Sequence, residues 1–160
     1  MAGRKKAEGP DEIKYVTRNR RAAYEYELIE TLECGIVLVG TEVKTLREGH
    51  CLLEDAYARL QNDELWLIGC EIPEYSFGNR LNHKPKRDRK LLIHRREIAK
   101  FATNASIKGF TLIPIAVYFK NGRAKVEIAI ARGKQLHDKR QSVKEKQAKR
   151  DIAREISKRR

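Results

Sequence analysis

FTLIPIAVYFKNGRAKVEIAIARG, residues 110–133, contains two apolar runs that meet at Asn121-Gly122. Asn-Gly between alternating apolar runs is a strong hairpin signal, because both residues tolerate the positive φ angles of a type I′ turn. Pro114 lacks a backbone N–H, which confines its strand to a sheet edge or to a bulge at that point. The stretch therefore predicts a hairpin of two long antiparallel strands.

Two segments on the N-terminal side of this hairpin also have strand patterns. From Tyr24 onward, residues 24–40 alternate apolar residues with glutamates, and Gly35 indicates a bend or bulge between two strand segments. Residues 56–72 carry two apolar runs around the polar turn Gln-Asn-Asp. This arrangement predicts a second hairpin.

Two other segments have helix patterns. Residues 41–49 place Thr41 at the N-cap position and Gly49 at the C-terminal stop. Residues 98–109 repeat apolar side chains at helical spacing and end at Gly109. We expect the second helix to cover one side of the sheet.

The order of these elements predicts the fold class. About six strands and two or three flanking helices, joined mostly as hairpins, favour a mostly β fold, a small antiparallel OB-like barrel. Residues 1–17 are polar and charged, so we expect a flexible N-terminal arm. Residues 18–132 would form the barrel, with residues 73–90 as a long loop. Residues 133–160 would form a basic C-terminal tail that is disordered alone and helical on a partner.

The charge of the chain points to a polyanionic partner. The 160 residues carry a net charge of +13, an excess that usually indicates nucleic acid or an anionic membrane surface. Residues 133–160 contain eleven Lys and Arg against four acids, and residues 78–90 contain six against one. The second segment also holds His83 and two Asn, so cations that pair with phosphates lie beside groups that stack on or hydrogen-bond to bases.

The tail has one further pattern. Ala148, Ile152 and Ile156 recur every four residues and would form a narrow apolar stripe on a basic helix. The stripe has no Trp, Phe or Leu to enter a bilayer, which argues against a membrane-surface role.

Cysteine usage and the apolar runs indicate the compartment. Cys34, Cys51 and Cys70 are odd in number and widely spaced, which predicts reduced, partly buried thiols in the cytosol. The basic N-terminus has no apolar stretch behind it, and the longest apolar run, residues 112–119, is far shorter than a membrane span. We therefore expect a cytoplasmic protein.

No enzymatic motif is present in the sequence. The four histidines are scattered without a nucleophile or carboxylate at motif spacing, and Gly133-Lys134 lacks the frame of a phosphate-binding loop. We expect no catalytic residues, no cofactor and no metal site.

Several long motifs of the chain are similar to those of a known family. GTEVKTLREG, GNRLNHKPKRDRKLLIHRREI, YFKNGRAKVEIAIARGK and HDKR resemble, in order and spacing, the SsrA-binding protein (SmpB) family of bacterial trans-translation. The resemblance covers residues 15–140, and the tail matches in character. It implies an oligonucleotide-binding barrel, not an enzyme. The family binds the tRNA-like domain of transfer-messenger RNA (tmRNA) and delivers it to the empty A site of stalled ribosomes.

The resemblance also implies an RNA-binding surface. Asn19 would offer a donor and an acceptor to a base edge or a 2′-hydroxyl, and Arg89 and Lys90 would pair with phosphates. Glu33 would accept from a base amine or orient a neighbouring Arg, while Leu91 would belong either to the interface or to the core. The RNA-binding residues expected outside the tail are Asn19, Arg20, Arg21, Glu33, Lys44, Arg47, His83, Lys86, Arg87, Arg89, Lys90 and Leu91.

In the family the tail extends toward the decoding centre and becomes helical in the vacant mRNA entry channel. His137 departs from the pattern, because many members have Tyr at this position, although imidazole also stacks on a base. The tail residues expected to contact the ribosome are Lys134, His137, Asp138, Lys139, Arg140, Lys144, Lys149, Arg150, Ile152, Arg154, Ile156 and Lys158.

The resemblance implies a monomer that meets elongation factor Tu indirectly, on aminoacylated tmRNA. Two other functions stay open from the residues alone. One is a general structured-RNA-binding or ribosome-associated protein. The other is an RNA-processing enzyme that uses Glu33 with a histidine.

Overall fold

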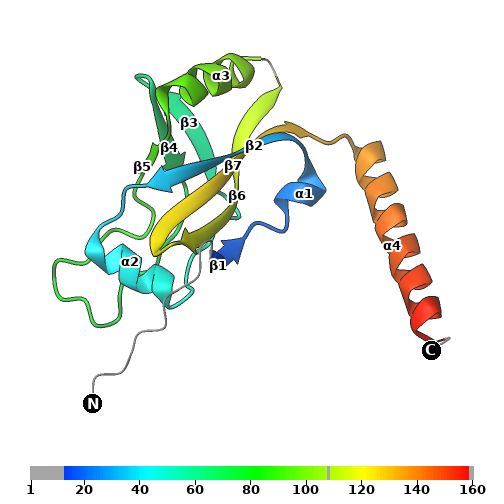
Figure 1. Ribbon diagram of the computed structural model, residues 1–160, viewed down its shortest axis with the longest axis horizontal. Helices are drawn as coiled ribbons and strands as arrows, with labels where there is room; N and C mark the ends of the chain where they lie inside the picture. Colours follow the sequence, from blue (N-terminus) through cyan, green and yellow to red (C-terminus); the bar gives the residue numbers. More distant parts are fainter. Residues whose placement is uncertain (1–12, 108, 159–160) are drawn as a thin grey trace.

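A seven-stranded antiparallel sheet and four helices form the part of the chain that the computed structural model describes, residues 13–107 and 109–158 (Figure 1). The elements are β1 (Ile13–Arg18), α1 (Ala22–Glu25), β2 (Tyr26–Ile36), α2 (Gly40–Arg47), β3 (Tyr57–Gln61), β4 (Glu64–Ile68), β5 (Arg89–Leu92), α3 (Arg95–Ala105), β6 (Phe110–Lys120), β7 (Arg123–Gly133) and α4 (Leu136–Lys158).

The sheet curls into a barrel-like ring. Its strand order is β1-β6-β3-β4-β5-β2-β7, and a further pairing of β6 with β7 joins six of the strands in a circle. The predicted mostly β, antiparallel fold is confirmed. The pairing of β3 with β6, which closes the ring, is short: Ala58 of β3 pairs with Leu112 of β6. The long β2, β6 and β7 strands therefore form the main wall of the ring.

The seventh strand, β1, lies on β6 outside the ring. Residues 13–17, which the sequence analysis placed in a flexible arm, form most of β1 and pair with β6 from Ile13 opposite Lys120 to Thr17 opposite Val117. Charged residues in this segment obscure a short alternation of apolar side chains. Residues 1–12 lie outside the described part of the chain.

The β6–β7 hairpin forms as predicted. Asn121 and Gly122 both have positive φ angles, 51° and 73°, as a type I′ turn requires. The register shifts between Pro114 and Ala116, so the strand has a bulge at the proline. The hairpin of residues 56–72 is also confirmed, because Asn62-Asp63 turns between β3 and β4 with positive φ at both residues.

The other predicted elements form with changed limits. Tyr24 lies in the short helix α1 rather than in a strand, and β2 begins at Tyr26. Helix α2 begins at Gly40, and its first turn is closed by the Glu42 carboxylate, which accepts the Val39 N–H at 2.9 Å. The predicted N-cap, Thr41, is therefore inside the helix. Arg89, expected at the end of a loop, begins β5.

Gly35 marks the point where β2 changes partners. It faces Lys125 of β7 and Leu92 of β5, and a Cβ on Gly35 would lie 3.1 Å from the Cβ of Leu92. The small residue thus permits the close approach of β5.

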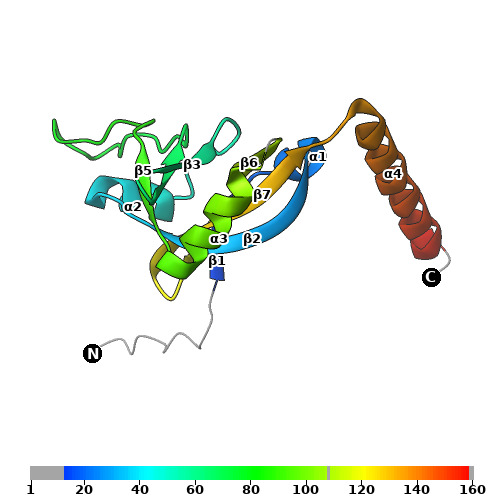
Figure 2. The same cartoon turned by 90° about the horizontal axis from the view of Figure 1, so that it is seen from above.

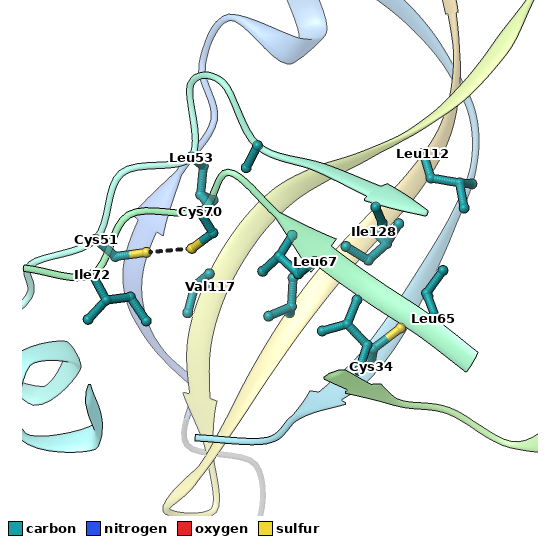
Figure 3. Packing of buried hydrophobic residues seen from close by; sticks show 14 of the residues in the cluster. Cys34, Cys51, Leu53, Leu65, Leu67, Cys70, Ile72, Leu112, Val117 and Ile128 are labelled. Carbon is teal, nitrogen blue, oxygen red and sulfur yellow. Dashed lines mark hydrogen bonds between the residues drawn. The ribbon is translucent and has the colours of Figure 1, made fainter. Parts of the chain in front are cut away.

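The interior of the ring is apolar (Figure 3). Leu67, Val117 and Ile128 meet in its centre, and Phe101 of α3 covers one end beside Leu112. All three cysteines are free and buried, with the sulfur atoms of Cys51 and Cys70 3.6 Å apart.

Helix α4 stands away from the ring (Figures 1 and 2). Its start is tied to α1, because Lys134 donates its backbone N–H to the Glu25 carbonyl and its ammonium to the Ala23 carbonyl, each at 2.9 Å. Every described side chain of α4 is exposed. The structure has the tail as a helix, and the expected dependence of this helix on a partner stays a prediction. None of the helices in residues 13–107 and 109–158 is long and apolar enough to cross a bilayer.

The turn of the β6–β7 hairpin gives a test of the fold. Gly122→Ala should lower the free energy of unfolding by about 1–2 kcal/mol, because a Cβ has open space there but φ lies in the left-handed region. Gly133→Ala is the matched control, since its Cβ also meets open space and its φ lies outside that region. Urea unfolding should show a change of less than about 0.5 kcal/mol for the control. Equal losses in the two variants would contradict the turn geometry.

Candidate nucleic-acid interface

A buried carboxylate holds the basic loop, residues 73–88, against the ring. Glu42 of α2 has no exposed surface and accepts from Arg87 Nη2 at 2.6 Å and from Arg89 Nε at 2.8 Å. Burying one charge is costly, but two guanidinium groups with hydrogen bonds offset that cost. The pair of ion pairs joins α2, the end of the loop and β5.

Arg89 is a structural residue. Its side chain has 0% exposure, and its remaining N–H groups donate to the carbonyl oxygens of Cys70 at 2.6 Å and of Pro85 and Arg87 at 3.0 Å. The predicted phosphate contact of Arg89 is therefore wrong, because no part of the guanidinium reaches the surface. Arg89 positions the loop instead.

Electrostatics keep Glu42 ionised. Burial alone would raise its pKa, but hydrogen bonds from Arg87 and the Val39 N–H and the charges of Arg89 and Arg87 bring the pKa below the ordinary value of 4.5. The loop is therefore tied down by a full charge at neutral pH.

Two further predicted contact residues are also buried. His83 is held on both ring nitrogens, with Nδ1 2.9 Å from the Thr41 hydroxyl and Nε2 2.9 Å from the Ile72 carbonyl. A carbonyl only accepts, so Nε2 donates to Ile72, while Nδ1 and the Thr41 hydroxyl share the second hydrogen bond. The predicted base contact of His83 is wrong, because its side chain is buried. Of the two places left open for Leu91, the structure has the core, where this side chain is 2% exposed.

Asn19 uses its amide within the protein. Its Nδ2 donates to the carbonyl oxygens of Leu53 and Pro114 at 3.3 Å, and its Oδ1 accepts the Ala22 N–H at 3.1 Å. The side chain thereby holds the start of α1 on the Pro114 bulge. The structure gives the half-buried Asn19 a positioning role, and its contact with RNA stays a prediction.

Cations and two tyrosines gather on the outer face of β1, β6, β7 and β2. Tyr15 and Arg18 are exposed, Lys120 and Lys125 are half-buried, and Tyr118 is buried. We call this surface the four-strand patch; it consists of Tyr15, Arg18, Glu33, Tyr118, Lys120 and Lys125. The Arg18 guanidinium lies 3.7 Å from the Tyr15 ring centre, and the ring centres of Tyr15 and Tyr118 are 5.4 Å apart. Cations beside an exposed tyrosine ring suit a nucleic-acid surface, because they pair with phosphates while the ring stacks on bases.

Glu33 organises the cations of the four-strand patch. Its carboxylate accepts the Tyr118 hydroxyl at 2.6 Å and lies 3.5 Å from the ammonium groups of Lys120 and Lys125. The Tyr118 hydrogen bond and the two lysines lower the pKa of Glu33, while the same hydrogen bond and burial raise that of Tyr118. Glu33 thus orients two lysines, where the orienting role predicted from the sequence named an Arg; the alternative role, a contact with a base amine, stays a prediction.

The other predicted basic residues lie on the surface in three groups. Lys44 and Arg47 are exposed on α2, and Arg20 and Arg21 are exposed before α1. On the loop and β5, Lys86 lies 3.4 Å from Glu71, Arg87 is partly exposed beside Glu42, and Lys90 pairs with Glu64. The structure therefore brings some predicted residues together but does not unite them in one site.

The tail residues of the prediction lie along α4 and at its start. Lys134 is half-buried against α1. The exposed ones are Asp138, Arg140, Lys144, Lys149, Arg150, Ile152, Arg154 and Ile156. His137, Lys139 and Lys158 are in the helical backbone, and their side chains lie outside the described part.

Sequence analysis missed most of the four-strand patch. Tyr15 was in the expected arm, and Tyr118, Lys120 and Lys125 were treated as strand residues of the hairpin. Their alternation along β6 and β7 carries the signal, because Tyr118 and Lys120 lie two residues apart and share one face of the strand. The Asn-Gly turn fixes Tyr118 opposite Lys125.

A hollow of about 800 Å³ lies between α3, β2, β5 and the β6–β7 turn. Glu33, His94 and Glu97 are among its lining residues. Glu33 is held by three partners with a lowered pKa, which makes it a poor general base or acid at neutral pH. Among the described residues, no group of three or more His, Cys, Asp or Glu could hold a metal ion.

The Glu42 network makes a stability prediction. Glu42→Gln should lower the free energy of unfolding by about 3–5 kcal/mol, because Arg89 keeps a buried charge without its anion. Glu64→Gln is the control, since it removes the half-exposed partner of Lys90 and should cost less than about 1 kcal/mol. Urea unfolding of both variants measures the difference. A loss of unfolding free energy as small as that of the control would show that the Glu42–Arg89 ion pair contributes little to stability.

The same network predicts a pH dependence. Because the folded pKa of Glu42 is lowered, its contribution should be complete above about pH 4.5 and fall as the pH drops through the folded pKa. The stability gap between the wild type and Glu42→Gln should therefore narrow below that pH. Urea unfolding at a series of pH values checks it, and a gap that stays constant or widens in acid would be the contrary result.

Known proteins resemble this chain along most of its length. A family model described as SmpB protein matches residues 16–158. The SsrA-binding protein of Thermobifida fusca is 49% identical over 160 residues, which is 100% of both chains. That of Desulforudis audaxviator is 53% identical over 141 residues, 88% of this chain and 92% of the relative.

A solved structure resembles the fold as well. A chain in the structure described as "tmRNA-SmpB: a journey to the center of the bacterial ribosome" is 43% identical and superposes with a TM-score of 0.65. The match covers 75% of this chain and 85% of that one. With the family model and the two relatives, it shows that the chain belongs to the SmpB family.

Proposed function

We propose that this protein binds the tRNA-like domain of tmRNA and delivers it to the empty A site of stalled ribosomes. The function is trans-translation, the rescue of ribosomes coupled to tagging of the stalled peptide. The protein acts as an RNA-binding partner and not as an enzyme. Its membership of the SmpB family and its similarity to a chain of the tmRNA-SmpB structure support this conclusion.

The structural observation that carries the proposal is the separation of α4 from the ring. All its described side chains are exposed, including Ile152 and Ile156 at 58% and 62%. A basic helix that buries so little apolar surface lacks the packing that stabilises most protein helices. It is suited to a second, anionic partner such as the walls of the mRNA entry channel.

The ring provides a second binding unit. The four-strand patch offers Arg18, Lys120 and Lys125 beside exposed Tyr15 and lies on a rigid antiparallel wall. Structured RNA is recognised by phosphate contacts together with stacking on exposed bases. We therefore place tmRNA on the ring and the ribosomal decoding centre at α4.

The remaining partners follow from this division. Elongation factor Tu would be met indirectly, through aminoacylated tmRNA, and the protein would act as a monomer in the cytoplasm. The four-strand patch has three cations against the one carboxylate of Glu33, and this excess of positive charge favours an RNA partner over a contact between copies, which would bring like charges together.

Truncation separates the two units. A chain that ends at Gly133 should bind tmRNA with nearly the affinity of the full chain, because the ring does not depend on α4 for its core. The same variant should lose tagging of stalled chains in a translation assay that contains tmRNA. Binding to a structured RNA of equal length without a tRNA-like elbow serves as the control. Equal affinity for both RNAs would instead support a general RNA-binding protein.

The four-strand patch predicts a salt dependence. Lys120→Ala and Lys125→Ala should each weaken tmRNA binding and reduce the slope of log affinity against log salt by about one unit per lost phosphate contact. Lys100→Ala is the control, because Lys100 lies on α3 and pairs with Glu30. Filter binding at several salt concentrations gives the slopes. Unchanged slopes for both variants would exclude phosphate contact at these lysines.

A further inference from the structure

The basic loop exposes two large apolar side chains. Phe77 is 81% exposed and Leu81 is 94% exposed, while the next most exposed large apolar side chain of the described residues, Ile156, is at 62%. An exposed phenylalanine in a positively charged loop is unusual, because exposing apolar surface costs free energy. Nothing in the ring covers these side chains.

The tip of this loop is an ordered turn. Asn82 closes it by donating Nδ2 to the Tyr75 carbonyl at 2.9 Å and accepting the Tyr75 N–H at 3.2 Å. The Gly78 N–H also donates to the Tyr75 carbonyl, at 2.8 Å. A Cβ on Gly78 would lie 2.5 Å from Asn82 Nδ2 and 2.9 Å from the Tyr75 carbonyl oxygen, so a larger residue would displace the turn. Phe77 is therefore presented by a fixed backbone.

The base of the loop is fixed as well. His83 bridges Thr41 of α2 and the Ile72 carbonyl, and Glu42 holds Arg87 at the other end. These contacts involve buried polar groups, and breaking them would cost free energy because the groups would be left unpaired. The loop is thus preorganised, and binding a partner at Phe77 costs little conformational entropy of the loop.

The surroundings of Phe77 are cationic. Its ring meets that of Tyr75 edge to face, with centres 5.7 Å apart, and the Lys44 ammonium lies 5.2 Å from the Tyr75 ring centre. The other exposed cations on the loop and α2 are Arg47, Arg80, Lys84 and Lys86. An apolar protein partner would have to desolvate these charges, whereas RNA pairs with them.

The position of the loop selects between two RNA partners. Figures 1 and 2 place the loop beside α2, at the opposite end of the molecule from α4. The two candidate partners are ribosomal RNA and tmRNA. In the proposed function α4 binds the ribosome and the ring binds tmRNA, so a loop far from α4 is expected to contact tmRNA.

We propose that Phe77 stacks on an unpaired base of tmRNA, with the cations of the loop and α2 pairing with the flanking phosphates. This site is separate from the four-strand patch, and the inference rests on the proposed function. Unpaired bases in RNA loops commonly stack on aromatic side chains, and Phe77 is the exposed aromatic ring of this loop.

Affinity measurements with four variants test the stacking. Phe77→Ala should weaken binding to tmRNA by about 5- to 100-fold, the range found for loss of one stacked base. Phe77→Leu should weaken it nearly as much, because it keeps apolar area but no π face, and Phe77→Trp should keep wild-type affinity. Leu81→Ala is the matched control and should change affinity by less than about threefold. Thermal unfolding should be unchanged in all four, since both side chains are exposed.

A tryptophan reporter observes the contact directly. The chain has one tryptophan, Trp66. In a Trp66→Phe background, Phe77→Trp should lose fluorescence when tmRNA is added, because an indole stacked on a base is quenched. Ile107→Trp in the same background, at a half-exposed site after α3, should keep its fluorescence.

The outcomes separate this inference from the proposed function. Full affinity in Phe77→Ala together with tight, selective tmRNA binding by the wild type would overturn the stacking alone. Wild-type affinity in Phe77→Leu would show that apolar area, and not a π face, makes the contact with tmRNA, and would also overturn the stacking. Lack of selectivity in the wild type would overturn the proposed function itself.

Discussion

The Glu42 carboxylate holds together three parts of the chain that are far apart in sequence. It begins α2 by accepting the Val39 N–H, fixes Arg87 at the end of the basic loop, and neutralises the fully buried Arg89 of β5. Arg89 in turn binds the carbonyl of Cys70 where β4 has ended. The loop conformation, the position of α2 and the closure of the ring at β5 therefore depend on one charge.

This arrangement divides the basic residues by what they do. Arg89 and part of Arg87 are used inside the protein, while Lys44, Lys84 and Lys86 are exposed. The two lysines of the four-strand patch are half-buried beside Glu33. Glu33 has a similar role on the surface, where it spaces Lys120 and Lys125 and holds the Tyr118 hydroxyl. A count of positive charges alone overstates the cations that are able to meet a phosphate.

Local signals predicted the fold well. The Asn-Gly turn, the bulge at Pro114 and the hairpin around Asn62-Asp63 each depend on the backbone preferences of neighbouring residues. The family was recognisable from long sequence motifs, whose order and spacing can be read without a structure. What the sequence could not predict was burial, because the partner of Arg89 lies 47 residues earlier in the chain.

The same limit explains the errors at the site. His83 is buried because it bonds to the Ile72 carbonyl, and the hydrogen bond of Asn19 to the Pro114 carbonyl likewise joins residues far apart in the chain. Local sequence patterns reveal neither contact. Strand β1 was missed because its alternation is short and charged, and with it Tyr15 of the four-strand patch.

The joint between α1 and Lys134 has a consequence for how the two units cooperate. Two hydrogen bonds fix the point where the tail leaves the ring, and the helix that follows spans 23 residues, about 35 Å at 1.5 Å per residue. A free peptide of the same sequence would have to find its target by diffusion through the whole volume. A tail fixed at one end samples only a small volume around the ring, so under the proposed function its local concentration at the ribosome would be high once the ring has bound RNA. The joint would thereby convert the binding of one partner into affinity for the other without any additional contact.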